Sequence, residues 1–119
     1  MTVQQAKEVW GDRAEFRGGG RQTGKTTQAM KDADALDGRA ILFTPFYNQV
    51  GILKNHFVGR LGHTPRFPIR WMNENLHGLR ARQDEAWFFD EYTHMDDKHL
   101  EEALDLAAIY GVQRLVFIG

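Results

Sequence analysis

The sequence predicts a three-layer α/β domain, in which helices cover both faces of a mainly parallel β-sheet. Short apolar runs of strand length alternate with segments in which apolar residues recur at helical spacing. The run Ala86–Asp90 is apolar until its last residue, which is typical of a strand buried on both faces of a parallel sheet. A glycine-rich stretch also stands between the first strand and the first long helix. Alternation of this kind favours parallel strands joined by helical crossovers.

The composition fits a single domain over residues 1–119. Of the 119 residues, 42% are hydrophobic and 26% are charged, which is enough for a modest core. Cysteine is absent, so disulfides and thiolate metal sites are excluded. No apolar run approaches the roughly 20 residues that span a bilayer, and the N-terminus lacks a signal-peptide pattern. We therefore expect a cytoplasmic protein without a membrane partner.

The first half of the chain is expected to hold two helices and two strands. A helix over about residues 2–10 precedes a first strand at Ala14–Arg17. The next helix begins at Lys25 and is stopped by Gly38, and the second strand follows at Arg39–Thr44. The buried stripe of the second helix is expected to consist of Ala29, Met30, Ala33 and Leu36.

In the second half, a helix is expected from about Phe46 to Leu61, and residues 63–82 are expected to be irregular, with a short extended pair around Ile69–Met72. After the strand Ala86–Asp90, a helix capped by Asp96 or Asp97 ends at Gly111, and the last strand is Arg114–Ile118. The inward residues of the first of these helices are expected to be Val50, Leu53, Phe57 and Leu61. Those of the helix that ends at Gly111 are expected to be Leu100, Ala103, Leu104 and Ala107.

The glycine-rich stretch has the complete pattern G-x-x-x-x-G-K-T of a phosphate-binding loop. Glycines let the backbone curl so that its N–H groups point at phosphate oxygens, and the helix that follows adds its positive dipole end. Lys25 supplies a charge to the β- and γ-phosphates, and the Thr26 hydroxyl is placed to bind Mg²⁺. The pattern predicts an ATP–Mg²⁺ site formed by Gly19, Gly20, Arg21, Gln22, Thr23, Gly24, Lys25, Thr26 and Thr27.

Two carboxylates end the strand Ala86–Asp90 at the edge where the loop is expected. Asp90 can reach the Mg²⁺ held by Thr26, and Glu91 would stand beside the γ-phosphate, where it can activate the attacking water. A strand followed by an acidic turn is the plainer interpretation of these residues alone. Together with the loop, they favour an ATPase over a kinase acting on a small acceptor.

Four segments of the chain follow one another in the order Gly20–Thr27, Leu42–Gln49, His77–Arg80 and Phe89–Asp96. Together they resemble the ATPase domain of the large terminase subunits that package DNA into phage heads. The ending Leu115–Gly119 is similar to a strand that the family continues as Gly-Thr-Pro. The likeness spans nearly the whole chain and implies a P-loop NTPase fold of the RecA/ASCE type.

The resemblance implies roles for two arginines in addition to the loop and the two carboxylates. Arg21 matches the arginine that terminases keep in the loop, where it senses or stabilises the γ-phosphate. Arg80, eleven residues before Glu91, falls where some terminases place an arginine finger that reaches into a neighbouring subunit. A guanidinium suits this task because it is always charged and can grip two oxygens. A solvated surface arginine is the alternative for Arg80, and Arg82 or Arg70 are substitutes for the finger.

Upstream of the loop, Gln4-Gln5 with Val9 resembles the adenine-reading glutamine motif of helicases and terminases. A glutamine amide can pair with both N6 and N7 of adenine, which makes Gln5 a candidate for base contact. A polar position on a helix face is the competing interpretation.

The charge pattern suggests a partner. Residues 54–82 contain six Lys and Arg against one acid, and residues 84–105 contain nine acids against Lys98. Two solvated faces explain such a pattern, but beside a nucleotide site the basic stretch is a candidate for contacting ATP or double-stranded DNA. The resemblance implies a homo-oligomer, or a partner chain that supplies missing terminase elements, in the cytoplasm of an infected host cell if the protein is phage-encoded.

The pattern departs from the family at Gly119, where a terminase would continue with its coupling segment, a further strand and a nuclease. Sheets of this class have the strand order 5-1-4-3-2, and here the fifth core strand would be missing. The strand before the loop would then lie at an edge of the sheet. We expect the N-terminal helix or another chain to cover that edge. Two alternatives stay open: a nucleotide-binding regulator that hydrolyses weakly, and a helicase-like ATPase for single-stranded nucleic acid, since Thr44-Pro45 resembles a helicase segment that contacts the strand backbone.

Overall fold

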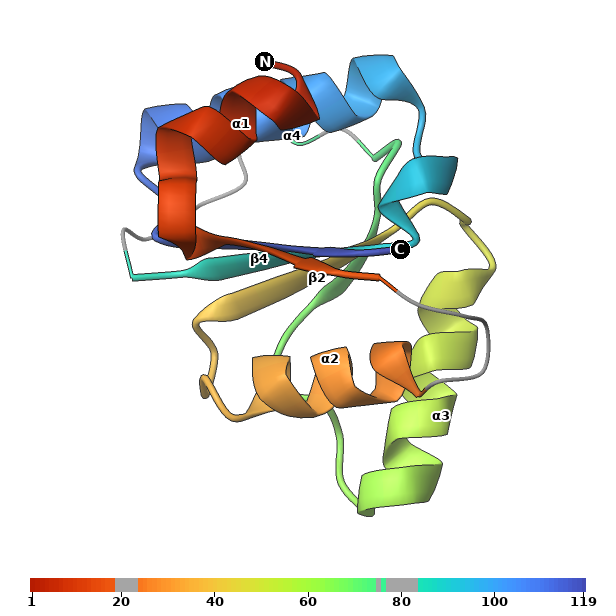
Figure 1. Ribbon diagram of the computed structural model, residues 1–119. Coiled ribbons are helices and arrows are strands. Elements are labelled where there is room, and N and C mark those ends of the chain that lie inside the picture. The colour runs from red at the N-terminus through yellow and green to blue at the C-terminus, as the bar shows by residue number, and fades with distance from the viewer. Residues whose placement is uncertain (19–23, 75, 77–83) are drawn as a thin grey trace.

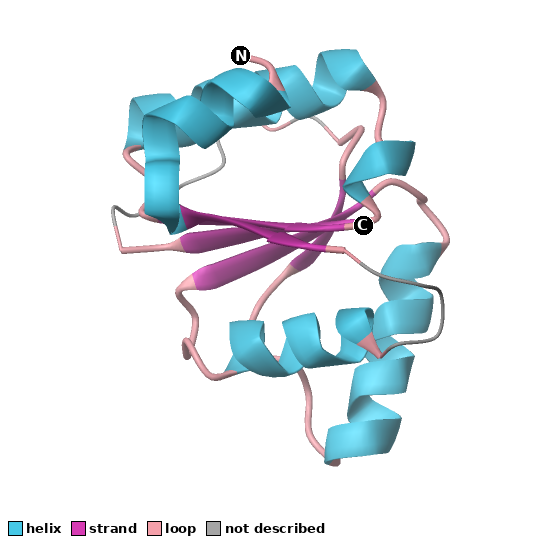
Figure 2. Ribbon diagram, in the orientation of Figure 1, coloured by secondary structure: helices cyan, strands magenta, loops and turns pink. Residues whose placement is uncertain are grey.

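A computed structural model describes residues 1–18, 24–74, 76 and 84–119 of the chain, which form one layered α/β unit (Figure 1). The strands are β1 (Ala14–Arg17), β2 (Ala40–Thr44), β3 (Ile69–Trp71), β4 (Ala86–Asp90) and β5 (Arg114–Ile118). The α-helices are α1 (Val3–Trp10), α2 (Lys25–Asp34), α3 (Gln49–Leu61) and α4 (Asp97–Tyr110), and the 3₁₀ turns are η1 (Gly11–Arg13) and η2 (Tyr92–His94). Helices α1 and α4 cover one face of the sheet, and α2 and α3 cover the other (Figures 1 and 2).

The five strands lie in the order β1-β5-β4-β2-β3, and all four neighbouring pairs are parallel. The three-layer α/β class and the parallel sheet expected from the sequence are confirmed. The four main strands take the expected relative order, with β1 at an edge of the described sheet. The expected extended pair around Ile69–Met72 is wrong, since this segment forms one short strand that pairs with β2 and extends the sheet at its other edge.

Four phenylalanines, one from each of four adjacent strands, stack across the α1/α4 side of the sheet. Phe16, Phe117, Phe89 and Phe43 are in register with their neighbours. Their ring centroids are 4.8, 5.1 and 5.3 Å apart in that order, with interplanar angles of 13–15°. Cross-strand aromatic pairs of this kind stabilise a sheet beyond their buried area, so the stack fixes the register of the strands that lead to the candidate site.

Two expected helix boundaries differ from the structure. Helix α2 ends at Asp34, before Gly38, because a turn of residues 35–38 with positive φ at Asp37 and Gly38 leads into β2. Helix α3 begins at Gln49 and not near Phe46, because the residues after Pro45 form a turn. The predicted buried stripe of α4 is confirmed in full, whereas in α3 only Leu53 and Phe57 are fully buried.

Helix α1 packs beside α4 and reaches the edge strand β1 only in part. Thr2 and Gln5 form a capping box at its start, and its buried residues are Ala6 and Trp10. Phe16 remains 39% exposed on β1, although Lys7 of α1 lies over its ring. Among the described residues, none of the helices is long and apolar enough to cross a membrane.

Candidate nucleotide site

The carboxyl ends of the parallel strands and the start of α2 meet at one edge of the sheet. Strand β1 ends at Arg17, whose carbonyl accepts from the Gly119 amide (2.8 Å) and so ties the end of β1 to the end of β5. Helix α2 then begins at Lys25, with Gly24 as its N-cap at φ 72° and ψ 17°. This left-handed conformation favours glycine, which explains the residue type at this position of the loop. In open parallel sheets, ligands bind at this edge.

The two predicted halves of the site are in direct contact. Thr26, in the first turn of α2, donates a hydrogen bond from Oγ1 to Asp90 Oδ1 at the end of β4, with a distance of 2.9 Å. These residues are 64 positions apart in the sequence. The hydroxyl and the carboxylate expected to share one cation therefore lie side by side.

Asp90 is buried, with 3% of its surface exposed, and this burial dominates its electrostatics. Desolvation raises the pKa of Asp90 to about 6, and the charge of neighbouring Glu91 adds to the rise. The hydrogen bond from Thr26 and the charge of Lys25 act in the opposite direction. An ionised carboxylate is thus held here at a cost, in the way expected where a bound cation later compensates it.

Glu91 has an unusual backbone conformation, with φ 47° and ψ 48°. A left-handed conformation costs a non-glycine residue roughly 1–2 kcal/mol, and such residues concentrate at functional sites. The turn η2 follows directly and is closed by a bond from the His94 amide to the Glu91 carbonyl (2.9 Å). The strain turns the chain sharply after Asp90 and leaves the Glu91 side chain partly exposed at the same edge.

Lys25 lies at this edge and donates a hydrogen bond from Nζ to the Gly119 carbonyl at 2.5 Å. The contact places the ammonium over the ends of β5 and β1, beside the start of α2. An ammonium on a flexible four-carbon stem can exchange a carbonyl for a phosphate oxygen with little rearrangement.

Two further predicted residues have structural partners. Thr27 Oγ1 lies 3.1 Å from His56 Nε2, which connects the first turn of α2 to α3. Gln5 is exposed, and its Oε1 accepts from the Thr2 amide at 2.8 Å in the capping box of α1. The capping contact gives Gln5 a role in the start of α1, and its adenine contact stays a prediction.

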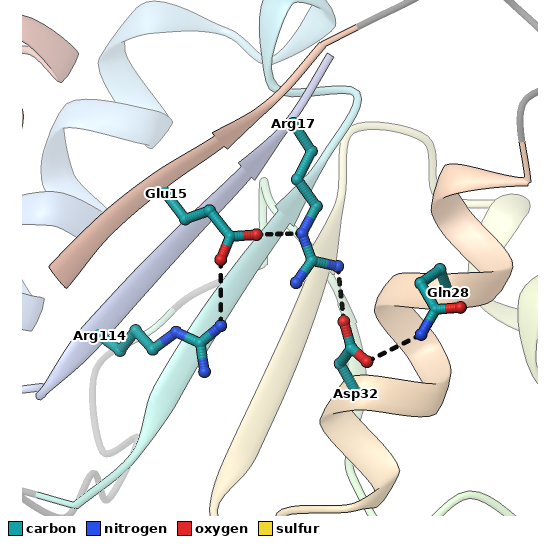
Figure 3. A network of polar contacts seen from close by, with 5 residues as sticks. All are labelled: Glu15, Arg17, Gln28, Asp32 and Arg114. Carbon is teal, nitrogen blue, oxygen red and sulfur yellow. Dashed lines mark hydrogen bonds and ion pairs between the residues drawn. The ribbon is translucent and has the colours of Figure 1, made fainter. Parts of the chain in front are cut away.

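A polar network on the α2 side of the sheet fixes the helix to the strand that precedes the loop (Figure 3). Arg17 is hydrogen-bonded to Glu15 on β1 and forms an ion pair with Asp32 of α2 at 2.7 Å. Glu15 also accepts from Arg114 at 3.2 Å, and Asp32 accepts from Gln28 at 2.9 Å. Burial disfavours the charged guanidinium, but pairing with Glu15 and Asp32 outweighs it and raises the pKa of Arg17. Sequence reasoning missed this network, whose signal was the alternation of charged residues along β1.

Sequence reasoning also missed the burial of the hydroxyl of Thr44, the last residue of β2. Thr44 has no exposed surface, and its hydroxyl has no hydrogen-bond partner among the described residues. The resemblance of Thr44-Pro45 to a helicase segment stays a prediction. The signal in the sequence was a polar residue ending an apolar strand, as Asp90 does in β4.

Other predicted residues lie outside the described residues. They are Gly19, Gly20, Arg21, Gln22, Thr23, Arg80 and Arg82.

The donor set fits Mg²⁺ held together with a nucleotide and not by protein alone. Within the described residues, no group of three or more His, Asp or Glu side chains could hold a metal ion. Mg²⁺ usually takes one or two protein oxygens and completes its shell with phosphates and water. Thr26 and Asp90 supply two hard oxygen donors at one point, and the unpartnered hydroxyl of Thr44 lies on the neighbouring strand.

Comparison with known proteins adds no relative. Neither the models of known protein families nor the curated protein sequences contain a match to the chain. The arguments for function therefore rest on the motifs and on the geometry of the site.

Proposed function

We propose that the chain is a P-loop ATPase module that binds ATP and Mg²⁺ at the carboxyl edge of its sheet and hydrolyses the γ-phosphate. The observation that carries the proposal is the 2.9 Å hydrogen bond between Thr26 and Asp90, which joins the loop motif to the acidic strand end. A glycine-rich surface loop and an unrelated acidic turn would have no reason to meet at this point.

Each described residue at the edge has a task in this proposal. Lys25 binds the phosphate oxygens, and Thr26 and Asp90 hold the cation. Bound Mg²⁺ would supply positive charge against the phosphate oxygens. Glu91 orients the attacking water and accepts its proton, a task for which a partly exposed carboxylate beside the cation ligand is suited.

Support for a terminase-like motor comes mainly from the motifs. The resemblance assigns Arg21 to γ-phosphate sensing and Arg80 to completing the site of a neighbouring subunit. In this proposal the protein works as an oligomer, or with a partner chain, on double-stranded DNA. The relative order of the four main strands agrees with the order expected for this class, because β5 separates β1 from β4.

Phosphate release by three proteins tests the proposal: the wild type, Lys25→Ala and Glu91→Gln. We expect turnover in the wild type only, because Lys25→Ala removes phosphate binding and Glu91→Gln removes the base. Glu91→Gln should still bind nucleotide, which a titration with a fluorescent ATP analogue measures.

The same experiment separates the alternatives. Nucleotide binding without turnover in the wild type, with and without double-stranded DNA, would leave the weakly hydrolysing regulator. Stimulation by single strands but not by duplex DNA would favour the helicase-like ATPase. Equal phosphate release in all three proteins would show that the activity does not belong to this site.

A further inference from the structure

The hydroxyl of Thr44 is a polar group for which the described fold provides no partner. Its residue has no exposed surface, and Oγ1 makes no hydrogen bond among the described residues. A buried hydroxyl without a partner costs free energy, whereas valine has the same shape and would remove that cost. Among the described residues, no hydrogen-bond partner favours threonine over valine at this position.

The register of the sheet puts this hydroxyl beside the candidate cation ligand. Phe43 of β2 pairs with Phe89 of β4, so the next residues, Thr44 and Asp90, stand next to each other on neighbouring strands. Strands in a sheet lie about 4.8 Å apart, and side chains at adjacent paired positions point to the same face. Asp90 faces the α2 side, where it meets Thr26, and Thr44 therefore faces that side too.

Asp90 thus lies beside two threonines, Thr26 of α2 and Thr44 of β2. Thr26 approaches from the α2 start and already donates to Oδ1. Thr44 lies on the neighbouring strand β2, and its hydroxyl can both donate and accept a hydrogen bond. A water molecule or a ligand oxygen fits between such groups when it finds two or more polar partners.

We propose that Thr44 is a further binding residue of the nucleotide site, whose hydroxyl hydrogen-bonds an oxygen of the hydrated magnesium–nucleotide complex beside Asp90. That oxygen belongs to a metal-bound water or to a phosphate. The inference rests on the proposed function, because it needs the ligand that Thr26 and Asp90 are proposed to hold. The proposal also accounts for the buried hydroxyl of Thr44, because the bound ligand would supply its hydrogen-bond partner.

Three variants test the proposed role of Thr44. Thr44→Val keeps the shape of the side chain and removes the hydroxyl, whereas Thr44→Ser keeps the hydroxyl. Thr64→Val makes the same change at an exposed position and is the control. Thermal unfolding without ligand should show Thr44→Val as stable as the wild type or more so. Its affinity for ADP with Mg²⁺, measured by calorimetry, should fall roughly ten- to a hundredfold, the effect of one lost hydrogen bond to a charged complex. Affinity for ADP in EDTA should change much less.

Thr44→Ser should keep the magnesium-dependent affinity, and Thr64→Val should resemble the wild type. Unchanged magnesium–ADP affinity in Thr44→Val, with loss in Lys25→Ala, would overturn the role of Thr44 and leave the proposed function standing. An equal loss in Thr44→Ser would also overturn it, because shape and not the hydroxyl would then decide. No binding of magnesium–ADP by the wild type would remove the proposed function itself.

Discussion

At the scale of single residues, Asp90 should lower the stability of the ligand-free protein and be required for binding of magnesium–ADP. At pH 8 the folded protein holds this buried carboxylate ionised, although burial raises its pKa to about 6. Asp90→Asn removes that cost, so we expect a gain on the order of 1 kcal/mol, or roughly 3–6 °C in Tm, without ligand. The same change should abolish the rise in Tm that magnesium–ADP gives to the wild type. Differential scanning fluorimetry at pH 8 measures both effects.

Asp37→Asn is the matched control for this change, because Asp37 is exposed and asparagine tolerates its positive φ. Its Tm should stay at the wild-type value in both conditions. A lower Tm for Asp90→Asn without ligand would mean that the bond from Thr26 outweighs the burial of the charge.

Glu91 should also lower the stability of the fold, through its strained backbone, while its side chain is required for hydrolysis. Glycine adopts the left-handed conformation of this residue without strain, so Glu91→Gly should stabilise the protein by about 1 kcal/mol while eliminating hydrolysis. Glu91→Gln keeps the strain and should lose hydrolysis without the gain. Urea unfolding measures the stabilities. The other described non-glycine residue with positive φ, Asp37, provides the comparison. Aspartate adopts this conformation with less strain than glutamate, so Asp37→Gly should stabilise less and leave hydrolysis intact.

At the scale of elements, the network between β1 and α2 should make stability depend on pH. The hydrogen bond from Arg17 and the nearby charge of Arg114 hold the pKa of Glu15 below its ordinary value of 4.5. A carboxyl group with a lowered pKa in the folded state stabilises the fold above its unfolded pKa. That contribution is lost as the pH falls from about 4.5 through the folded pKa.

We therefore expect Glu15→Gln to lower the free energy of unfolding at pH 7 and to have little effect near pH 3, where the wild type has lost the same contribution. Because Glu15 is partly exposed, the difference should be modest and should shrink in high salt. Urea titrations across this pH range measure it. Glu8→Gln, at an exposed position of α1, should give a curve parallel to the wild type. A pH-independent loss in Glu15→Gln would point to packing and not to charge.

Sequence patterns predicted the strands of this fold closely and its edges poorly. The strands Ala14–Arg17, Ala86–Asp90 and Arg114–Ile118 have the predicted bounds. An apolar run marks the second and third of them, and the glycines that follow Arg17 mark the end of the first. The three-residue strand β3 gives no periodic signal, and its pairing with β2 is a tertiary effect. Helix α3 begins three residues after the predicted start near Phe46, because the residues after Pro45 form a turn.

The candidate site was predictable where motifs name the residue types, and not where contacts involve residues outside the motifs. The meeting of Thr26 and Asp90 follows from two motifs and a parallel sheet. The burial of Thr44 depends on which strand lies beside β4, and the pairing of Arg17 with Asp32 depends on how α2 crosses β1. Both relations join elements that are distant in sequence, so the alternating charges of β1 and the polar end of β2 indicate polar positions but not their neighbours.

For the molecule as a whole, the proposed assembly predicts complementation between defective chains. Arg80→Ala and Glu91→Gln should each lack ATP hydrolysis, for different reasons. In mixed oligomers an intact arginine from one subunit can serve an intact Glu91 in another. Mixing the two variants should therefore restore part of the phosphate release, with a maximum near equal proportions. Strictly additive rates at all proportions would contradict an arginine that acts between subunits.

Helix α3, which has two basic residues and no acidic one, and the acidic helix α4 lie on opposite faces of the sheet, and this locates the proposed DNA contact. Residues 38–73, which include β2, α3 and β3, contain five Lys and Arg and no Asp or Glu. The acidic helix α4 lies across the sheet from α3 (Figure 1). Phosphate contacts by cationic side chains release counterions and make binding salt-dependent. Duplex DNA should therefore bind along α3, where Lys54 and Arg60 are exposed.

Reversing both charges, as Lys54→Glu with Arg60→Glu, should weaken binding to duplex DNA of any sequence. The slope of log Kd against log salt should also fall by roughly 2. The double variant Lys7→Glu with Lys98→Glu changes the net charge by the same amount on the α1/α4 side, and it should bind nearly as the wild type does. Fluorescence anisotropy over a salt series compares the two. An equal loss in both variants would show that net charge, and not the α3 side, governs binding, and an absence of duplex binding by the wild type would remove DNA as the partner.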